Sequence, residues 1–133
     1  MYLTQGLHRA LQRCPDKTAL THLDDAGTRR HTHAQLMKGV ALQAAALAKR
    51  GIGRGDRVAL LAPNSDRLVR AILACWWLGA AACPLNIRWS TPELAHALQD
   101  SEAALLLVDA SLAALAPRNG PALVELSALE EEG

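Results

Sequence analysis

Three short runs of consecutive apolar residues occur after position 56. They occupy positions 58–62, 80–85 and 103–108. Strands that are apolar on both faces are typical of the middle of a parallel sheet. Between these runs, apolar residues recur at helical spacing over 66–78 and again over 91–99. We therefore expect an α/β fold with a partial doubly wound parallel sheet. Its β-α-β-α-β unit runs from about 57 to 108 with right-handed crossovers.

Both helices of this unit have recognisable start signals. The turn Pro-Asn-Ser-Asp at 63–66 precedes the first helix, and either Asn64 or Ser65 is suited to cap it. We expect its buried side chains to be Leu68, Ile72, Leu73 and Trp76, and its outward side chains to be Asp66, Arg67 and Arg70. The second helix begins with Ser-Thr-Pro-Glu at 90–93, which fits a capping box with proline in the first turn.

Shorter elements surround this unit. We expect a helix over 4–13, strands over 18–23 and 29–33 joined by a turn at 24–27, a helical turn over 111–115 and a final strand over 122–126. The first two strands form a hairpin at the edge of the fold. A longer helix begins at Thr32, where Thr-His-Ala-Gln fits a capping box, and Gly51 is suited to end it. The apolar stripe of this helix is Leu36, Val40, Ala44 and Leu47.

The composition narrows the class of protein. A chain of 133 residues that is 50% hydrophobic suits one domain with a core of Ala, Leu and Val. A net charge of +1 gives no sign of binding to nucleic acid or to an anionic membrane. The three cysteines, Cys14, Cys75 and Cys83, show no Cys-x-x-Cys spacing and predict reduced thiols. Because we find no secretory signal and no apolar run of ~18–20 residues, we expect a cytoplasmic protein without a membrane span.

No segment predicts a complete catalytic site. The glycine-rich stretch at 51–56 follows a helix and opens a strand, the reverse of a dinucleotide-binding fingerprint, so we interpret it as a helix end and a turn. The turn at 63–66 lacks glycine, and the charge of Asp66 would oppose a bound phosphate. His31 and His33 share one face of a strand, where we expect a solvated histidine face and not a metal site. We predict no catalytic residue and no metal ligand in the chain.

Three segments of the chain carry sequence motifs whose order and spacing match those of one known family. They are His-Thr-His-Ala-Gln-Leu at 31–36, Gly-Asp-Arg-Val-Ala-Leu-Leu-Ala-Pro-Asn-Ser at 55–65 and Leu-Gly-Ala-Ala-Ala-Cys-Pro-Leu-Asn-Ile-Arg at 78–88. Together they resemble the N-terminal region of the adenylate-forming acyl-CoA synthetase and AMP-acid ligase family, the AMP-binding enzymes. The chain departs from the family at His33, where the family has Tyr, and at Gln35, where it has Glu. Gln35 still completes the helix cap.

The resemblance implies a function for a longer enzyme. In this family ATP, with Mg²⁺, converts a carboxylic or fatty acid into an acyl-adenylate, and coenzyme A then displaces AMP. The family's phosphate loop, nucleotide contacts, acyl pocket and C-terminal domain have no counterpart in 1–133. We therefore expect 1–133 to be the N-terminal section of the large domain of such a ligase. By this expectation it is inactive alone, binds no cofactor alone, has the rest of the enzyme as its partner and self-associates when isolated.

The resemblance also implies one binding residue. Some family members use the arginine at the position of Arg88 to contact a phosphate of coenzyme A, and a guanidinium suits phosphate because it donates two hydrogen bonds at once. The alternative is a loop arginine that is bonded to nearby carbonyls or to a carboxylate. Two other function classes stay open. One is a non-catalytic interaction module with an apolar patch at Trp76, Trp77 and Trp89. The other is a small nucleotide-binding protein, against which the acidic turn at 63–66 argues.

Overall fold

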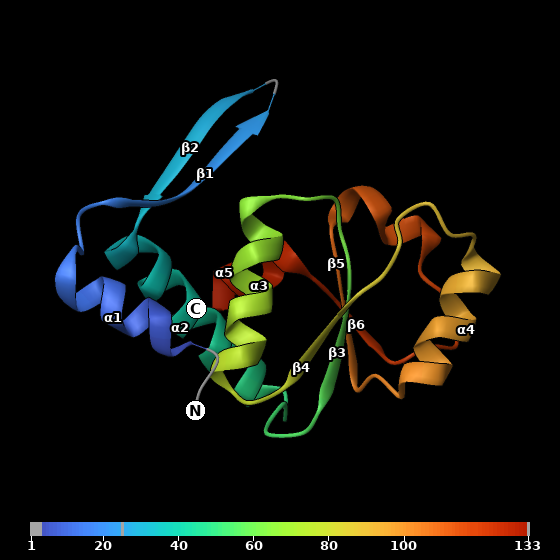
Figure 1. Ribbon diagram of the computed structural model, residues 1–133. Helices are drawn as coiled ribbons and strands as arrows, with labels where there is room; N and C mark the ends of the chain where they lie inside the picture. The colour runs from blue at the N-terminus through green and yellow to red at the C-terminus, as the bar shows by residue number, and fades with distance from the viewer. Residues whose placement is uncertain (1–3, 25, 133) are drawn as a thin grey trace.

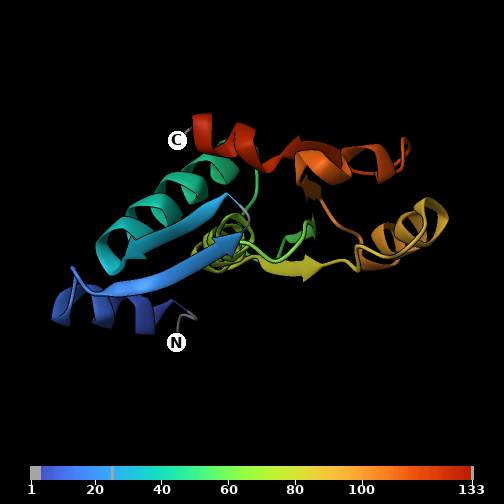
Figure 2. The same ribbon diagram turned by 90° about the horizontal axis from the view of Figure 1, so that it is seen from above.

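The computed structural model describes residues 4–24 and 26–132 and shows a parallel sheet between helices, with a separate hairpin (Figures 1 and 2). The helices are α1 (Gln5–Arg13), α2 (His33–Lys49), α3 (Asp66–Trp77), α4 (Thr91–Ser101) and α5 (Leu126–Glu132), with a 3-10 helix η1 (Ala110–Leu115). The strands are β1 (Thr18–Asp24), β2 (Gly27–Thr32), β3 (Arg57–Leu61), β4 (Ala81–Pro84), β5 (Leu105–Val108) and β6 (Ala122–Glu125). Each of these except α5 confirms an element that the sequence predicts.

The main sheet has the strand order β4-β3-β5-β6, and all its neighbouring pairs are parallel. Val58 of β3 is aligned with Leu105 of β5, and Leu61 with Val108. The chain leaves β3 through α3 to reach β4 and then crosses back through α4 to β5 on the other side of β3. This crossing places helices on both faces, which confirms the doubly wound α/β fold.

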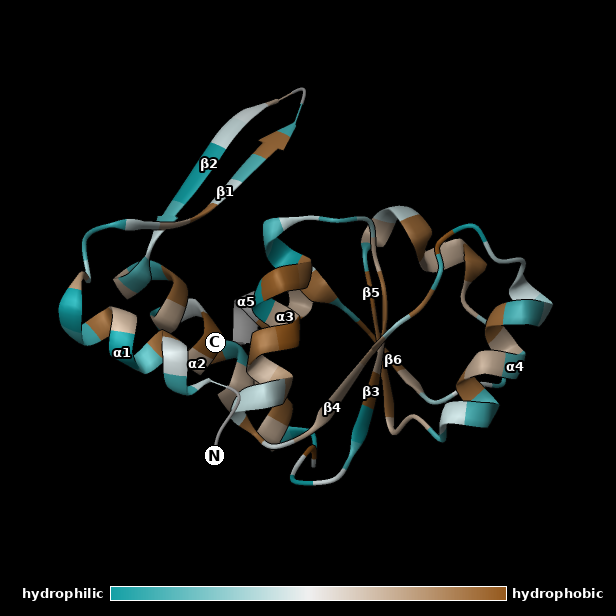
Figure 3. Cartoon of the chain, in the orientation of Figure 1, coloured by the Kyte–Doolittle hydropathy of each residue, from teal (hydrophilic) through white to brown (hydrophobic). Residues whose placement is uncertain are grey.

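Two separate apolar cores cover the two faces of the sheet. On one face, Val58 and Leu60 pack with residues of α2, α3 and α5. On the other face, Ala59 and Leu61 pack with Leu94 of α4 and with residues of η1. Successive strand residues point to opposite faces, so a continuous apolar run supplies both cores at once. The hydropathy colouring shows the result, because the central strands are apolar along most of their length (Figure 3).

The prediction that all three apolar runs lie in the middle of the sheet is wrong for the run at 80–85. Among the described strands, β4 pairs only with β3 and forms an edge of the sheet. Its residues are half-buried or exposed, whereas β5 is buried at every position. The side chains of β4 are mostly small, and an apolar run of alanines carries no mark that separates an edge strand from a central one.

The helix ends follow the predicted chemistry. Thr32 and Ser90 each form a full capping box, with Gln35 and Glu93 as the reciprocal partners. Gly51 has a φ of 87°, and the N–H of the next residue donates to the carbonyl of Leu47 at 3.1 Å, which is a Schellman motif. The glycine-rich stretch is therefore a helix end and a turn, as expected. None of the helices in the described ranges combines the length and apolar character that a membrane crossing requires.

The hairpin of β1 and β2 forms a two-stranded antiparallel sheet of its own and rises above the helices in the view of Figure 1. Only its base contributes to the apolar core, through Ala19 and Leu20. Toward the tip, 74% of Leu23 is exposed. The hairpin thus has little apolar burial of its own, and other contacts must set its orientation.

Candidate functional site

The carboxyl edge of the sheet is where a doubly wound fold places its ligands. After β3 the chain turns into α3 on one face of the sheet, and after β5 it turns into η1 on the other face. Adjacent strands whose connections leave toward opposite faces create a crevice at their carboxyl ends, which is the usual ligand site in open α/β sheets. Three segments line this edge here. They are 62–65 after β3, 85–90 after β4 and 109–111 after β5.

Side chains of the turn after β3 accept hydrogen bonds from the N-terminus of α3. Ser65 caps α3, because its Oγ accepts from the N–H of Leu68 at 3.1 Å. Of the two residues that the sequence offers as the cap, the structure therefore uses Ser65. The next residue, Asp66, is 2% exposed, and the N–H of Arg67 donates to its Oδ1 at 3.0 Å. The carboxylate takes up hydrogen-bonding capacity of the helix N-terminus that an anion would otherwise use.

The prediction that Asp66 points outward is wrong. Arg29 donates from Nε to Oδ2 at 3.0 Å and from its terminal nitrogen to Oδ1 at 2.8 Å, so the pair is bidentate. His31 Nε2 lies 2.9 Å from Oδ2. The hairpin folds across the start of α3 and covers the carboxylate, which helical periodicity alone does not reveal. A buried carboxylate is tolerated here because it is paired and fully hydrogen-bonded.

The electrostatics of this cluster favour an ionised Asp66. The hydrogen bonds from the Arg29 guanidinium hold the pKa of Asp66 well below its usual value, and the bond from His31 acts in the same direction. Burial of the carboxyl group opposes this shift but is the smaller effect. At the other end of the hairpin, the contact from His22 lowers the pKa of the exposed Asp24.

The two histidines at 31 and 33 do not form the solvated face that the sequence predicts. His31 is on β2 and its half-buried ring contacts Asp66, whereas His33 is the first residue of α2. Among the residues that the structure describes, no cluster of three or more His, Cys, Asp or Glu side chains is arranged to hold a metal ion. The three cysteines are free thiols, and burial raises the pKa of Cys75 to about 12.

Arg88 lies in the exposed loop that follows β4 at the carboxyl edge. The loop is shaped by Asn86, whose Oδ1 accepts from the backbone N–H of Arg88 at 2.9 Å. In the described part of the chain, no hydrogen bond or ion pair ties down the Arg88 guanidinium. The neighbouring Ile87 and Trp89 are 39% and 36% exposed. Trp89 also lines a shallow hollow of about 420 Å³ beside the first turns of α4.

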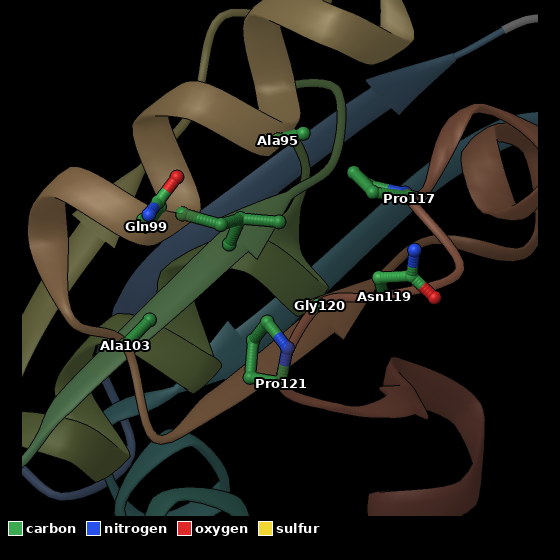
Figure 4. A pocket seen from close by; sticks show the side chains of 8 residues that line it. Ala95, Gln99, Ala103, Pro117, Asn119, Gly120 and Pro121 are labelled. Carbon is green, nitrogen blue, oxygen red and sulfur yellow. The ribbon is translucent and has the colours of Figure 1, made fainter.

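A second hollow lies at the amino ends of the strands. It has a volume of about 500 Å³ and opens between α4 and the loop that leads into β6 (Figure 4). Its lining includes Leu98 and Gln99 from α4 and Pro117, Asn119 and Pro121 from the loop. No charged side chain lines it, and it lies at the amino ends of the strands, away from the crevice at their carboxyl ends. Sequence reasoning did not find this hollow, because its walls carry no chemical motif.

Comparison with known proteins places these features in context. The chain matches the family described as AMP-binding enzyme over residues 7–132. It is 40% identical over 99 residues to a feruloyl-CoA synthase of an Amycolatopsis species, covering 74% of this chain and 19% of that protein. It is 36% identical over 109 residues to the 3-hydroxybenzoate–CoA/4-hydroxybenzoate–CoA ligase of Thauera aromatica, covering 81% and 18%.

The same likeness holds in three dimensions. The fold superposes on o-succinylbenzoate CoA synthetase from Bacillus subtilis, solved with its acyl-adenylate intermediate, with a TM-score of 0.87 at 29% identity. The match covers 97% of this chain and 33% of the other. The chain therefore spans about a fifth of the length of the curated relatives cited here and about a third of this solved structure.

Proposed function

The chain belongs to the AMP-binding enzyme family, and from this premise we propose that it is the N-terminal section of the large domain of an AMP-forming carboxylic acid–CoA ligase. One observation carries the proposal. Two of the three family motifs each include a strand and the loop after it. The motif at 55–65 includes β3, and the motif at 78–88 includes β4. Both loops therefore lie at the carboxyl edge, where a doubly wound sheet presents its binding groups.

The reaction of such a ligase has two steps. A carboxylate attacks the α-phosphate of ATP and gives an acyl-adenylate and pyrophosphate, and the thiol of coenzyme A then displaces AMP. The residues at 62–66 do not fit a triphosphate, because the turn lacks glycine and the buried carboxylate of Asp66 already occupies the start of α3. We therefore assign the binding of ATP and Mg²⁺ to the rest of the ligase and propose that 1–133 has a scaffold role and no activity alone.

Arg88 is the residue of this section that we propose to bind coenzyme A. Its exposed guanidinium, its place at the carboxyl edge and the turn that Asn86 stabilises all suit a contact with a phosphate. The guanidinium presents two parallel N–H donors to such a group. The relatives named above act on aromatic carboxylic acids, by their names, and we propose a carboxylic acid as the substrate class here.

Calorimetric titration of the 133-residue chain tests both assignments. We expect no saturable heat with ATP·Mg²⁺, and a weak signal with coenzyme A that disappears in Arg88→Ala. Arg118→Ala is the matched control, since it removes the same charge from an exposed loop near the amino ends of the strands. Saturable binding of ATP would contradict the scaffold role. Equal losses in both arginine variants would show non-specific attraction of the coenzyme A phosphates.

The isolated chain is also proposed to self-associate. Within the described residues, β6 pairs with β5 on one side only, and Leu123 on this edge strand is 44% exposed. An exposed strand edge with an apolar side chain is a template for pairing with another chain. Sedimentation velocity at increasing concentration is expected to show a shift toward larger species. A monomer at every concentration would refute this part of the proposal.

A further inference from the structure

The β1–β2 hairpin is joined to the rest of the molecule by a narrow base. Its ladder runs from Thr18 paired with Thr32 at the base to Asp24 paired with Gly27 at the tip, and the register shifts between Thr18 and Leu20. A register shift of this kind bends a strand and weakens the local ladder. Beyond it the hairpin projects over the start of α3 (Figure 1). The distal hairpin is thus bent relative to its base, and its orientation depends on further contacts.

The buried carboxylate of Asp66 contacts side chains from both strands of the hairpin. Arg29 and His31 are two apart on β2, so their side chains share a face, and both contact Asp66. From β1, the Nδ1 atom of His22 lies 4.0 Å from Oδ1 of the same carboxylate. Arg30, between the two β2 residues, is exposed and belongs to the opposite face. The distal hairpin therefore meets α3 through polar contacts.

The carboxylate of Asp66 is saturated by these contacts. An ionised carboxylate offers about four acceptor positions. Oδ1 accepts from a terminal nitrogen of Arg29 and from the backbone N–H of Arg67, and Oδ2 accepts from Nε of Arg29 and pairs with His31. Movement of the hairpin away from α3 would remove three of these four contacts, the two from Arg29 and the one from His31. Because the hairpin covers Asp66, this movement would also replace the bidentate ion pair with contacts to water, so an intact hairpin and an ionised Asp66 favour each other.

We propose that Asp66 is an ionic latch that fixes the β1–β2 hairpin against α3, and that loss of its charge releases the hairpin as one unit while the parallel sheet stays folded. Because Asp66 directly follows the turn at 62–65, the latch also ties the orientation of the hairpin to the carboxyl edge of the sheet. The proposal uses only contacts within this chain and does not depend on the ligase function.

Hydrogen–deuterium exchange of the purified protein tests the latch. In Asp66→Asn, which keeps the shape of the side chain, we expect the ladder amides of β1 and β2 to exchange roughly 10- to 100-fold faster. The amides of β3 and β5 are expected to stay protected, because the parallel sheet stays folded. Unchanged exchange in the hairpin would overturn the proposal. Loss of protection in β3 and β5 together with the hairpin would also overturn it, because Asp66 would then support the whole fold.

Two arginine variants of the hairpin keep the test decisive if Asp66→Asn does not fold. Arg29→Gln removes the bidentate partner from a position that is half exposed, and we expect it to accelerate hairpin exchange as Asp66→Asn does. Arg30→Gln removes the same charge from the next residue of the same strand and is expected to leave exchange unchanged. Equal effects of the two variants would refute the latch, because net charge and not the contact with Asp66 would be responsible.

Discussion

The parallel sheet and the β1–β2 hairpin reach their positions by different means. In the sheet, β5 is buried at every position and shares two apolar cores with helices on both faces. In the hairpin, none of the residues of β1 and β2 is fully buried, and the contact with α3 depends on Arg29, His31 and Asp66. Apolar burial is non-directional and is shared among many side chains. A bidentate ion pair is directional and concentrated in two side chains, so one substitution removes it.

The largest effect is expected in the sheet. Leu107 of β5 is fully buried, and Leu107→Ala is expected to lower the free energy of unfolding by about 2–5 kcal/mol, since it leaves a cavity in a packed core. Chemical denaturation measures this loss. Leu123→Ala, on the neighbouring edge strand at 44% exposure, is the control and should cost about 0.5 kcal/mol or less. Equal costs at the two positions would contradict the burial pattern.

The second effect comes from acid and acts through Asp66. Its pKa in the folded protein lies below the usual 3.8, so its contribution to stability is complete above that value and is lost as the pH falls toward the folded-state pKa. Because half of Arg29 is exposed, we expect a discounted contribution of about 1–2 kcal/mol. Unfolding measured from about pH 5 downward is expected to be less acid-dependent in Asp66→Asn than in wild type.

Asp100→Asn is the control for this acid series, because Asp100 is exposed at the end of α4, on the other face of the sheet from the hairpin cluster. Its acid dependence should match that of wild type. If Asp66→Asn also matches wild type, then Asp66 does not titrate as the hydrogen bonds from Arg29 and His31 require.

The third effect concerns a helix end of the sheet region. Gly79 has a φ of 76° and ends α3 in a Schellman motif, so Gly79→Ala is expected to cost about 1 kcal/mol of unfolding free energy through backbone strain. The added Cβ meets Arg54 no closer than 3.5 Å, so crowding is not the cause. Gly6→Ala within α1 has open space and should instead stabilise by about 0.5–1 kcal/mol, because alanine favours a helix. Effects of the same sign would refute this explanation.

The same contrast explains what the sequence could predict. Local signals were sufficient for the helix starts at Thr32 and Ser90 and for the buried strand β5, because each acts within a few residues. They did not show that β4 lies at an edge of the sheet. The family motifs predicted the same fold. Asp66 was misplaced because its partners, Arg29 and His31, are 37 and 35 residues away. Periodicity reports which face of a helix is apolar, and it does not report that a distant hairpin covers a charged residue at the helix start.

The features of the candidate site also differ in how far the sequence predicts them. The carboxyl edge and the acidic turn at 63–66 follow from strand order and from the residues themselves, so the sequence was enough to locate them. The assignment of Arg88 to coenzyme A came from the resemblance and remains a proposal. The hollow of about 500 Å³ beside α4 had no signal in the sequence, because it is formed by the relative placement of Leu98 and the loop around Gly120.

The smallest effect sharpens the comparison, because the sheet region also contains an ion pair between an arginine and a carboxylate. Arg57 approaches Glu102 at 3.9 Å, with side chains that are 51% and 82% exposed. Water screens such a pair, and holding two long side chains in place costs entropy, so Glu102→Gln is expected to change the free energy of unfolding by less than about 0.5 kcal/mol. A double-mutant cycle with Arg57→Gln measures the coupling directly.

The matching cycle on Arg29 and Asp66 should give a clearly larger coupling, since that pair is bidentate and its carboxylate is 2% exposed. The two cycles use the same chemical groups and differ in geometry and in burial. Similar coupling energies would mean that neither geometry nor burial distinguishes the two contacts, and the hairpin would then have to be held by its apolar base at Ala19 and Leu20. A large coupling confined to the hairpin would show that directional charge pairing replaces apolar burial where the fold supplies little of it.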